Sequence, residues 1–351
     1  MRTSTLDPQH TFHTLLDASL RHGPEYGGGM SSHLPMALHA LHALGAGSVR
    51  LHAFNEVYVR HLVAQPAPAA KARPLPPDWR DARGDFSAFE ALRLYFESQL
   101  HDQGRDATLR VSLPALWPGA AGAAFHGLIR TAHAVQSDHP PELAAALAYW
   151  TARWQAVPPS GSPARHEPLP VAAWAAQVEA AALQLRLPGR SISGRISAAV
   201  QTAHYAAWAE ATAVDGLLPL SDWAADLYTR SGNFTVLHVV TATRAARVLW
   251  PWTTARGEVR QGLLRAATAA VLASNLQPAE WVDSAGPLPT WPELIERAIA
   301  SDDEHVIKLV HALVEERSVY GEGSRQRAAA RALHFGSLIR YLDMTTAPIS
   351  G

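Results

Sequence analysis

The 351-residue sequence contains no cysteine. This absence excludes disulfide bonds, thiolate nucleophiles, iron–sulfur clusters and zinc sites built on cysteine. A metal ion in this chain would therefore be bound by imidazole, carboxylate or a less common ligand.

The sequence also lacks an excess of charge of either sign. Its 30 basic and 31 acidic residues give a formal net charge of -1. We expect no nucleic-acid partner, because polyanions select a strongly basic surface.

Long apolar runs are missing as well. No segment offers about 18 consecutive uncharged apolar residues, and the N-terminal region carries Arg2, Asp7 and Asp17 without an apolar run. We therefore expect no membrane-spanning helix, no secretory signal and a cytoplasmic protein.

Against these absences stands an excess of histidine. The chain has 18 histidines although only 17% of its residues are charged, and its 48% hydrophobic content supplies a sizeable core. A functional interpretation has to account for these imidazoles.

The apolar pattern predicts an all-α protein. Apolar residues recur at three and four positions, and period-two alternation bounded by hairpin turns is absent from the pattern. Two capping boxes, Thr290 with Glu293 and Ser301 with Glu304, mark C-terminal helices. The other expected helices run from Ser32 to Leu44, from the residue after Asp85 to before Gly104, from Gly122 to Ser137, from Val171 to Leu187, from Ile192 to Val214, from Asn233 to Trp250 and from Arg325 to Leu342.

Two proline-rich stretches, Gln65 to Trp79 and Val157 to Pro170, interrupt the helices. Each is either a domain linker or a long surface loop. We interpret both as loops, because histidine-bearing helices lie on both sides of each stretch and a shared site requires one packed unit. Residues 1–351 are thus expected to form a single large helical domain with the site among its central helices.

The first histidine motif follows three glycines, Gly27 to Gly29. A nucleotide loop is disfavoured, since no strand precedes the glycines and no lysine follows them. In the helix after them, His33 lies at the margin of the apolar stripe and faces the interior, whereas His39 points away from the stripe. A histidine satisfied by backbone at a helix start explains His33 equally well.

His126 and His133 share one edge of a second apolar helix. They are two turns apart, about 10 Å along the axis, so one metal ion cannot bind both. One is a candidate ligand and the other a pocket wall or structural hydrogen-bond donor. In a third helix, His238 has small or apolar neighbours, and it is either a metal ligand or a buried histidine with a hydrogen-bond partner.

His305 and Lys308 stand one turn apart on a helix that is apolar nearly all round. Burial lowers the pKa of a lysine, and a neutral amine can react with carbon dioxide to give a carbamate, which is a carboxylate on a long arm. The alternative is a lysine that reaches the surface or pairs with a carboxylate such as Glu304.

Two weaker signals complete the set. His204, beside Tyr205 and Trp208, could line an aromatic pocket, although a packed amphipathic helix explains it as well. The pair His101-Asp102 is similar to the central pair of the all-helical HD phosphohydrolases, without well-spaced partners.

Four of these motifs together resemble the questin oxidase-like family. They are Ser32-His33-Leu34-Pro35-Met36-Ala37-Leu38, Phe125-His126-Gly127-Leu128-Ile129-Arg130, Leu237-His238-Val239-Val240-Thr241 and Glu304-His305-Val306-Ile307-Lys308-Leu309, in that order across most of the chain. The resemblance implies an oxygen-dependent oxidoreductase that acts on polycyclic aromatic ketones such as anthraquinones, by Baeyer–Villiger-type insertion or oxidative ring opening. It also implies a non-haem iron held by four histidines and a carboxylated lysine, here His33, His126, His238, His305 and Lys308.

Departures from the family pattern concern the pocket. Ser32 stands where many relatives have asparagine, and His133 where an aromatic residue is more usual. Baeyer–Villiger activity in the family is associated with NADPH, yet the chain has no dinucleotide fingerprint. A reductant would therefore act through a separate reductase or keep the iron ferrous.

The sequence thus predicts Fe(II), with dioxygen and a small aromatic molecule as reaction partners and with His133 and His204 as candidate catalytic residues. Two other classes stay open. A metal-dependent hydrolase of the HD type would use the same ligands with zinc or manganese, and a helical small-molecule-binding protein would need no metal.

Overall fold

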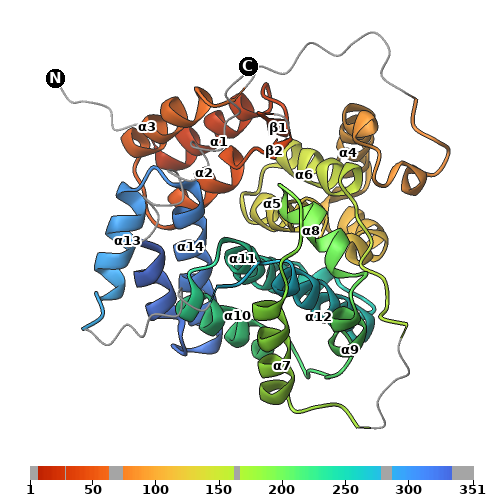
Figure 1. Cartoon of the computed structure of the whole chain (residues 1–351). Helices are drawn as coiled ribbons and strands as arrows, with labels where there is room; N and C mark the ends of the chain where they lie inside the picture. The colour runs from red at the N-terminus through yellow and green to blue at the C-terminus, as the bar shows by residue number, and fades with distance from the viewer. Residues whose placement is uncertain (1–6, 28, 63–73, 162–166, 278–286, 334–351) are drawn as a thin grey trace, which may run out of the picture.

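The computed structural model describes residues 7–27, 29–62, 74–161, 167–277 and 287–333, and it is all-α (Figure 1). A short antiparallel pair of strands, β1 (Glu25–Tyr26) and β2 (Met30–Ser31), is the exception in this part of the chain. The helices are α1 (Pro8–Ser19), α2 (Leu34–Ala43), α3 (Ser48–Val59), α4 (Phe89–Leu116), α5 (His126–Gln136), α6 (Pro140–Ala152), α7 (Val171–Gln184), α8 (Ile192–Ala199), α9 (Ala203–Trp208), α10 (Leu218–Ser231), α11 (Phe234–Leu249), α12 (Arg256–Leu272), α13 (Trp291–Ala300) and α14 (Glu304–Tyr320). Single 3-10 turns lie at Trp79–Ala82, Phe86–Ala88, Trp117–Gly119 and Trp250–Trp252.

The expected all-α class is confirmed, but several boundaries are corrected. The helix expected from Ile192 to Val214 is two helices, because Thr202 caps a new one by accepting a hydrogen bond from Tyr205 N at 3.1 Å. The helix expected to end before Gly104 continues as α4 through a kink at that glycine, where φ is 78°. Of the helix expected from Arg325 to Leu342, residues 325–333 are helical and the remainder lies outside the described residues.

One of the two capping boxes is also corrected. Thr290 and Glu293 form the predicted box at the start of α13. At α14 the cap is Asp303, whose carboxylate accepts from His305 N at 2.9 Å and Val306 N at 3.3 Å. Ser301 instead ends α13, so the start of α14 lies two residues later than predicted.

Some elements were not predicted from the apolar pattern. Helix α6 is buried on every side, so it has no amphipathic stripe. In the described parts of the two proline-rich stretches, residues 74–78, 157–161 and 167–170 are not helical, and Trp79 begins a 3-10 turn. Among the residues described, no helix has the length and apolar character needed to cross a membrane.

Four helices form a closed ring at the centre of the fold. Helix α2 packs against α5 and α14, and α11 packs against the same two helices. We call α2, α5, α11 and α14 the central helices. Around them, α1 and α3 pack on α2, α6 on α5, and α10 and α12 on α11 (Figure 1).

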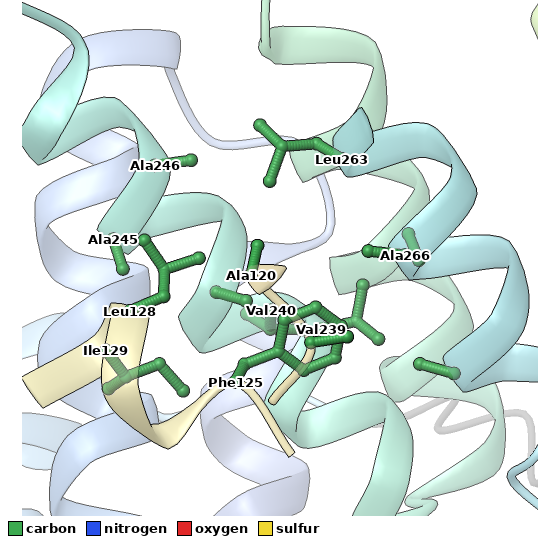
Figure 2. Close-up of a cluster of buried hydrophobic side chains, with 14 of the residues drawn as sticks. Ala120, Phe125, Leu128, Ile129, Val239, Val240, Ala245, Ala246, Leu263 and Ala266 are labelled. Carbon is green, nitrogen blue, oxygen red and sulfur yellow. The ribbon is translucent and has the colours of Figure 1, made fainter. Parts of the chain in front are cut away.

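The apolar packing behind the central helices is continuous with the main core. Figure 2 shows the seam where α5, α11 and α12 meet. Its labelled side chains are all apolar: Ala120, Phe125, Leu128, Ile129, Val239, Val240, Ala245, Ala246, Leu263 and Ala266. All ten are buried, which fixes the positions of α5 and α11 relative to each other.

We predict that Gly127→Ala destabilises the protein by about 1–3 kcal/mol, because α5 and α6 approach closely at this residue. A methyl group at Gly127 would lie 2.6 Å from Trp150 Cα and 2.7 Å from its Cβ. The matched control is Gly257→Ala in the first turn of α12, where no atom lies within 4 Å of the new methyl group. The control should stabilise by up to about 1 kcal/mol through helix propensity. Urea unfolding of both variants measures the difference, and equal effects would contradict the close approach.

Candidate metal centre

Four predicted histidines lie together where the N-terminal ends of the central helices converge. His33 precedes the first residue of α2, His126 is the first residue of α5, His305 is the second residue of α14, and His238 is in the second turn of α11. We call these four residues the first cluster. Their side chains are buried, with 2–9% of each residue exposed.

The rings of the first cluster are in mutual contact. His33 Nε2 lies 2.7 Å from His126 Nε2, and the two rings stack with centroids 4.6 Å apart. The ring of His305 meets that of His33 edge-on at 4.6 Å. His238 closes the group, with its centroid 5.0 Å from that of His126 and 5.7 Å from that of His305.

His126 is held by an unusual backbone turn. Ala123, Ala124 and Phe125 all have left-handed conformations, with φ of 47°, 54° and 68°. Such residues cost about 1 kcal/mol or more each and persist where surrounding packing fixes them. The turn brings the Ala123 carbonyl into hydrogen-bonding contact with His126 Nδ1. The bond assigns the proton to Nδ1 and leaves the Nε2 lone pair free.

In the other three rings, Nδ1 also faces an oxygen atom. His238 Nδ1 donates to the Phe234 carbonyl at 2.8 Å. His33 Nδ1 lies 3.6 Å and His305 Nδ1 lies 3.5 Å from Glu304 Oε1. Each Nδ1 therefore faces a carbonyl or a carboxylate, which is how the outer nitrogen of a metal-bound histidine is usually held. At His126 and His238 the Nε2 atom therefore remains as the donor. His33 Nε2 and His126 Nε2 lie 2.7 Å apart, and possible ligand atoms of His33, Glu304 and His305 lie within 4.8 Å of one another.

Lys308 lies one turn beyond His305, and only 2% of it is exposed. Among the described residues it makes no hydrogen bond or ion pair, so neither sequence alternative, a lysine at the surface or one paired with Glu304, describes this side chain. Burial lowers the pKa of Lys308 to about 8, against the opposing effect of Glu304 and Asp303. Burial thus makes the neutral amine more accessible than in a lysine exposed to solvent.

The electrostatics of the site favour neutral imidazoles. Burial lowers the pKa of His33, His126 and His238 well below 6.5, and the positive charge of Lys308 adds to the shift. The helix N-terminal ends act in the same direction, because their unpaired N–H groups carry partial positive charge. Neutral imidazole is the form that binds a metal ion.

The prediction for His39 is wrong. It is 5% exposed and not directed outward, because α1, α3, α5 and α14 surround α2 and leave it no solvent-facing side at this position. His39 lies with His133 and His311, one layer further along the central helices. We call these three residues the second cluster.

His133 and His204 do not join the first cluster. His133 Nδ1 lies 2.8 Å from His39 Nδ1, two turns of α5 beyond His126. His204 is on α9, which packs on α7 and α12 (Figure 1), and its neighbour Tyr205 donates a hydrogen bond to the Pro158 carbonyl. Their catalytic roles stay predictions that no contact in the described chain supports. His101 and Asp102 are exposed on α4, so the HD-type pair is not part of either cluster.

Sequence reasoning assigned no role to Glu304 as an orienting group or to His311. The sequence predicts Glu304 as the capping-box partner of Ser301 and as a possible ion-pair partner of Lys308. A signal for His311 was available, since it lies six residues after His305 on one helix, as His39 does after His33. When two helices run side by side in the same direction, an equal separation of two histidines on each helix indicates two layers of histidines.

We predict that the metal-free protein loses stability as the pH falls below about 6.5. Unfolded histidines take up protons there while the buried ones stay neutral, so acid favours the unfolded state and pH above this range has no such effect. Each buried histidine contributes up to about 1.4 kcal/mol per pH unit to the loss. The histidines whose pKa burial lowers in this way are His33, His39, His126, His133, His238 and His311. Urea unfolding of chelator-treated protein across this range tests it, and an unfolding free energy that stays constant would contradict it.

The comparison with known families covers the part of the chain that carries both clusters. A family model described as questin oxidase-like matches residues 30–313. No curated protein matches the chain. The matched residues make up most of the sequence and include both histidine clusters and Lys308. The chain therefore belongs to the questin oxidase-like family.

Proposed function

We propose that this protein is a non-haem iron oxygenase that acts on a polycyclic aromatic ketone or quinone. The family supports an oxidoreductase acting on polyketides. The observation that carries the finer proposal is the mutual contact of four buried histidine rings, with one buried lysine a turn away from His305. Iron and the carboxylated lysine were implied by the family resemblance, and the following contacts support them.

The donor set suits Fe(II). Imidazole nitrogens with an anionic oxygen ligand are typical of non-haem iron, and the Nδ1 contacts of His126 and His238 leave the Nε2 atom of each as the metal-binding nitrogen. His33, His126, His238, His305 and Lys308 would hold the ion. Bound Fe(II) supplies redox chemistry with dioxygen and Lewis acidity toward a substrate oxygen.

Lys308 would supply the anionic ligand as a carbamate. The neutral Nζ attacks the carbon of carbon dioxide, a nitrogen–carbon bond forms, and one carbon–oxygen π pair moves to oxygen while the nitrogen loses a proton to solvent. The buried position favours the neutral amine that this reaction needs. The charges of Glu304 and Asp303 act against this effect of burial on the pKa of the amine.

The first cluster has an aromatic edge for substrate binding. The ring of Phe234 lies 4.8 Å from that of His238 and 4.7 Å from that of His305, and Phe234 is partly exposed. On the other side, the Tyr58 hydroxyl accepts a hydrogen bond from His33 N at 2.9 Å. A fused-ring substrate would stack on Phe234. We therefore propose this edge in place of Tyr205 and Trp208.

The two reaction types differ in their electron balance. Baeyer–Villiger-type insertion places one oxygen atom in the substrate and reduces the other to water, so it needs two electrons from a donor. Ring cleavage that incorporates both oxygen atoms needs none. Since the chain has no dinucleotide fingerprint, we propose that NADPH would serve only indirectly, through a separate reductase.

We predict that the protein reconstituted with Fe(II) retains about one equivalent of iron per chain, and that this iron is lost when any one of His33, His126, His238 or His305 is replaced by Ala. Each change removes one nitrogen of the donor set. His52→Ala, on an exposed position of α3, is the control and should keep the iron. Elemental analysis measures both. Binding of zinc or manganese in place of iron would favour a hydrolase. Absence of any metal at the first cluster would contradict the proposed iron oxygenase.

We predict that Lys308→Met folds normally but loses oxygen consumption and most of its iron, because methionine keeps the length and apolar character and cannot form a carbamate. Lys308→Arg should be less stable than Lys308→Met, since its permanent charge is expensive to bury. Melting temperature and iron content separate the two effects. In wild-type protein equilibrated with ¹³C-labelled bicarbonate, a carbamate resonance should appear that Lys308→Met lacks. Full iron retention by Lys308→Met would reduce the ligand set to histidine alone.

A further inference from the structure

The second cluster has the geometry of a binding site in its own right. One ring nitrogen each of His39, His133 and His311 lie within 4.8 Å of one another. The ring centroids are 5.0 Å apart for His39 and His133, 5.3 Å for His39 and His311, and 5.4 Å for His133 and His311. The three residues come from α2, α5 and α14 and are only 2–5% exposed.

Polar atoms of this cluster lack partners. Both ring nitrogens of His311 are buried without a hydrogen bond among the described residues. His39 Nδ1 and His133 Nδ1 are hydrogen-bonded to each other at 2.8 Å, so the atoms without a partner are those of His311. A buried polar nitrogen without a hydrogen-bond partner lowers the stability of the folded protein by about 1–3 kcal/mol. An unpaired nitrogen in a native structure therefore indicates a ligand or another function.

The charged groups around the cluster are arranged to hold His311. Glu315 Oε1 lies 3.6 Å from His311 Nε2. Arg244 Nε donates to Glu315 Oε2 at 2.6 Å, and Arg247 Nη2 donates to the same oxygen at 3.2 Å. The carboxylate is thus fixed beside Nε2, which leaves Nδ1 of His311 for a ligand. A histidine placed between a carboxylate and a metal ion is a recurring arrangement in metalloproteins.

We propose that His39, His133 and His311 form a second metal site, which binds Zn²⁺ through their three Nδ1 atoms. Three histidines with one further position is a common zinc coordination set. Six residues separate His33 from His39 and His305 from His311, which corresponds to about 9 Å of helix rise. The ion is therefore distinct from one at the first cluster, and the two are too far apart to share a bridging ligand.

The proposed ion would link helices that are distant in sequence. It would tie α2 to α5 and α14 one layer beyond the first cluster, and so hold the ring of central helices closed. The Glu315 carboxylate would orient His311, and its own charge is already balanced by that of Arg244. The site does not depend on iron binding or on oxygenase activity.

The experiment uses a protein from which the first cluster has been removed, His33→Ala with His126→Ala. After chelator treatment this variant should take up one equivalent of Zn²⁺ in equilibrium dialysis, and Zn²⁺ should raise its melting temperature. Adding His311→Leu should abolish both the uptake and the rise. Co²⁺ used as a spectroscopic probe should give the visible absorption of a four-coordinate site in the first variant and not in the second.

Two more conservative variants distinguish loss of a metal ligand from misfolding. In the same background, His39→Gln removes one donor but keeps a polar side chain, and should also abolish uptake. Glu315→Gln keeps all three donors and should weaken Zn²⁺ binding by about 10- to 100-fold. Absence of Zn²⁺ uptake in a folded protein without the first cluster would overturn the proposal, and so would uptake that His39→Gln and His311→Leu leave unchanged. Neither result bears on whether the intact first cluster holds iron.

Discussion

The burial of uncharged imidazoles at the converging ends of four helices is the constraint on which this structure depends. An imidazole taken out of water needs a partner for each nitrogen, or the fold loses stability. At His126 and His238 the backbone supplies one partner through the carbonyls of Ala123 and Phe234. At His33 and His305 the carboxylate of Glu304 lies on the corresponding side. The ring nitrogens on the inner side of the cluster contact one another, as His33 Nε2 and His126 Nε2 do. A cation bound between them would therefore stabilise the folded chain.

This constraint explains the connectivity. The central helices run in the same direction, since the N-terminal end of each lies at the first cluster and α2, α5 and α14 continue into the second. Parallel neighbours cannot be joined by short turns. The chain between α2 and α5 accordingly forms α3 and α4, and that between α5 and α11 forms α6 to α10. Much of the outer layer in Figure 1 thus consists of connections that return the chain to the same end of the bundle.

The sequence predicts the parts of this arrangement that are local. Apolar spacing indicates the central helices, and Lys308 is expected to be buried because its neighbours are apolar on nearly every side. The spacing of apolar residues does not predict side-chain direction where a helix is buried on every side. Helix α2 is covered all round, so His39 has no solvent-facing side to occupy. Helix α6 has no amphipathic stripe. The left-handed turn before His126 involves ordinary alanines, and no residue type there signals positive φ. The second cluster is found only when helices distant in sequence are placed side by side.

Lys308 connects the two layers electrostatically. His305, Lys308 and His311 follow one another at single-turn spacing along one face of α14, so the amine lies between the clusters. As an ammonium it lowers the pKa of His33, His126, His238 and His133, and it repels any cation in either layer.

Conversion of Lys308 to a carbamate reverses the sign of that charge, which replaces repulsion of a cation with attraction at both layers. The first cluster then has two anionic groups, the carbamate and Glu304, to balance a divalent ion. The second has only Glu315, whose charge Arg244 already offsets. These charges favour tighter binding of a divalent ion at the first cluster than at the second, if both clusters hold metal ions as we propose.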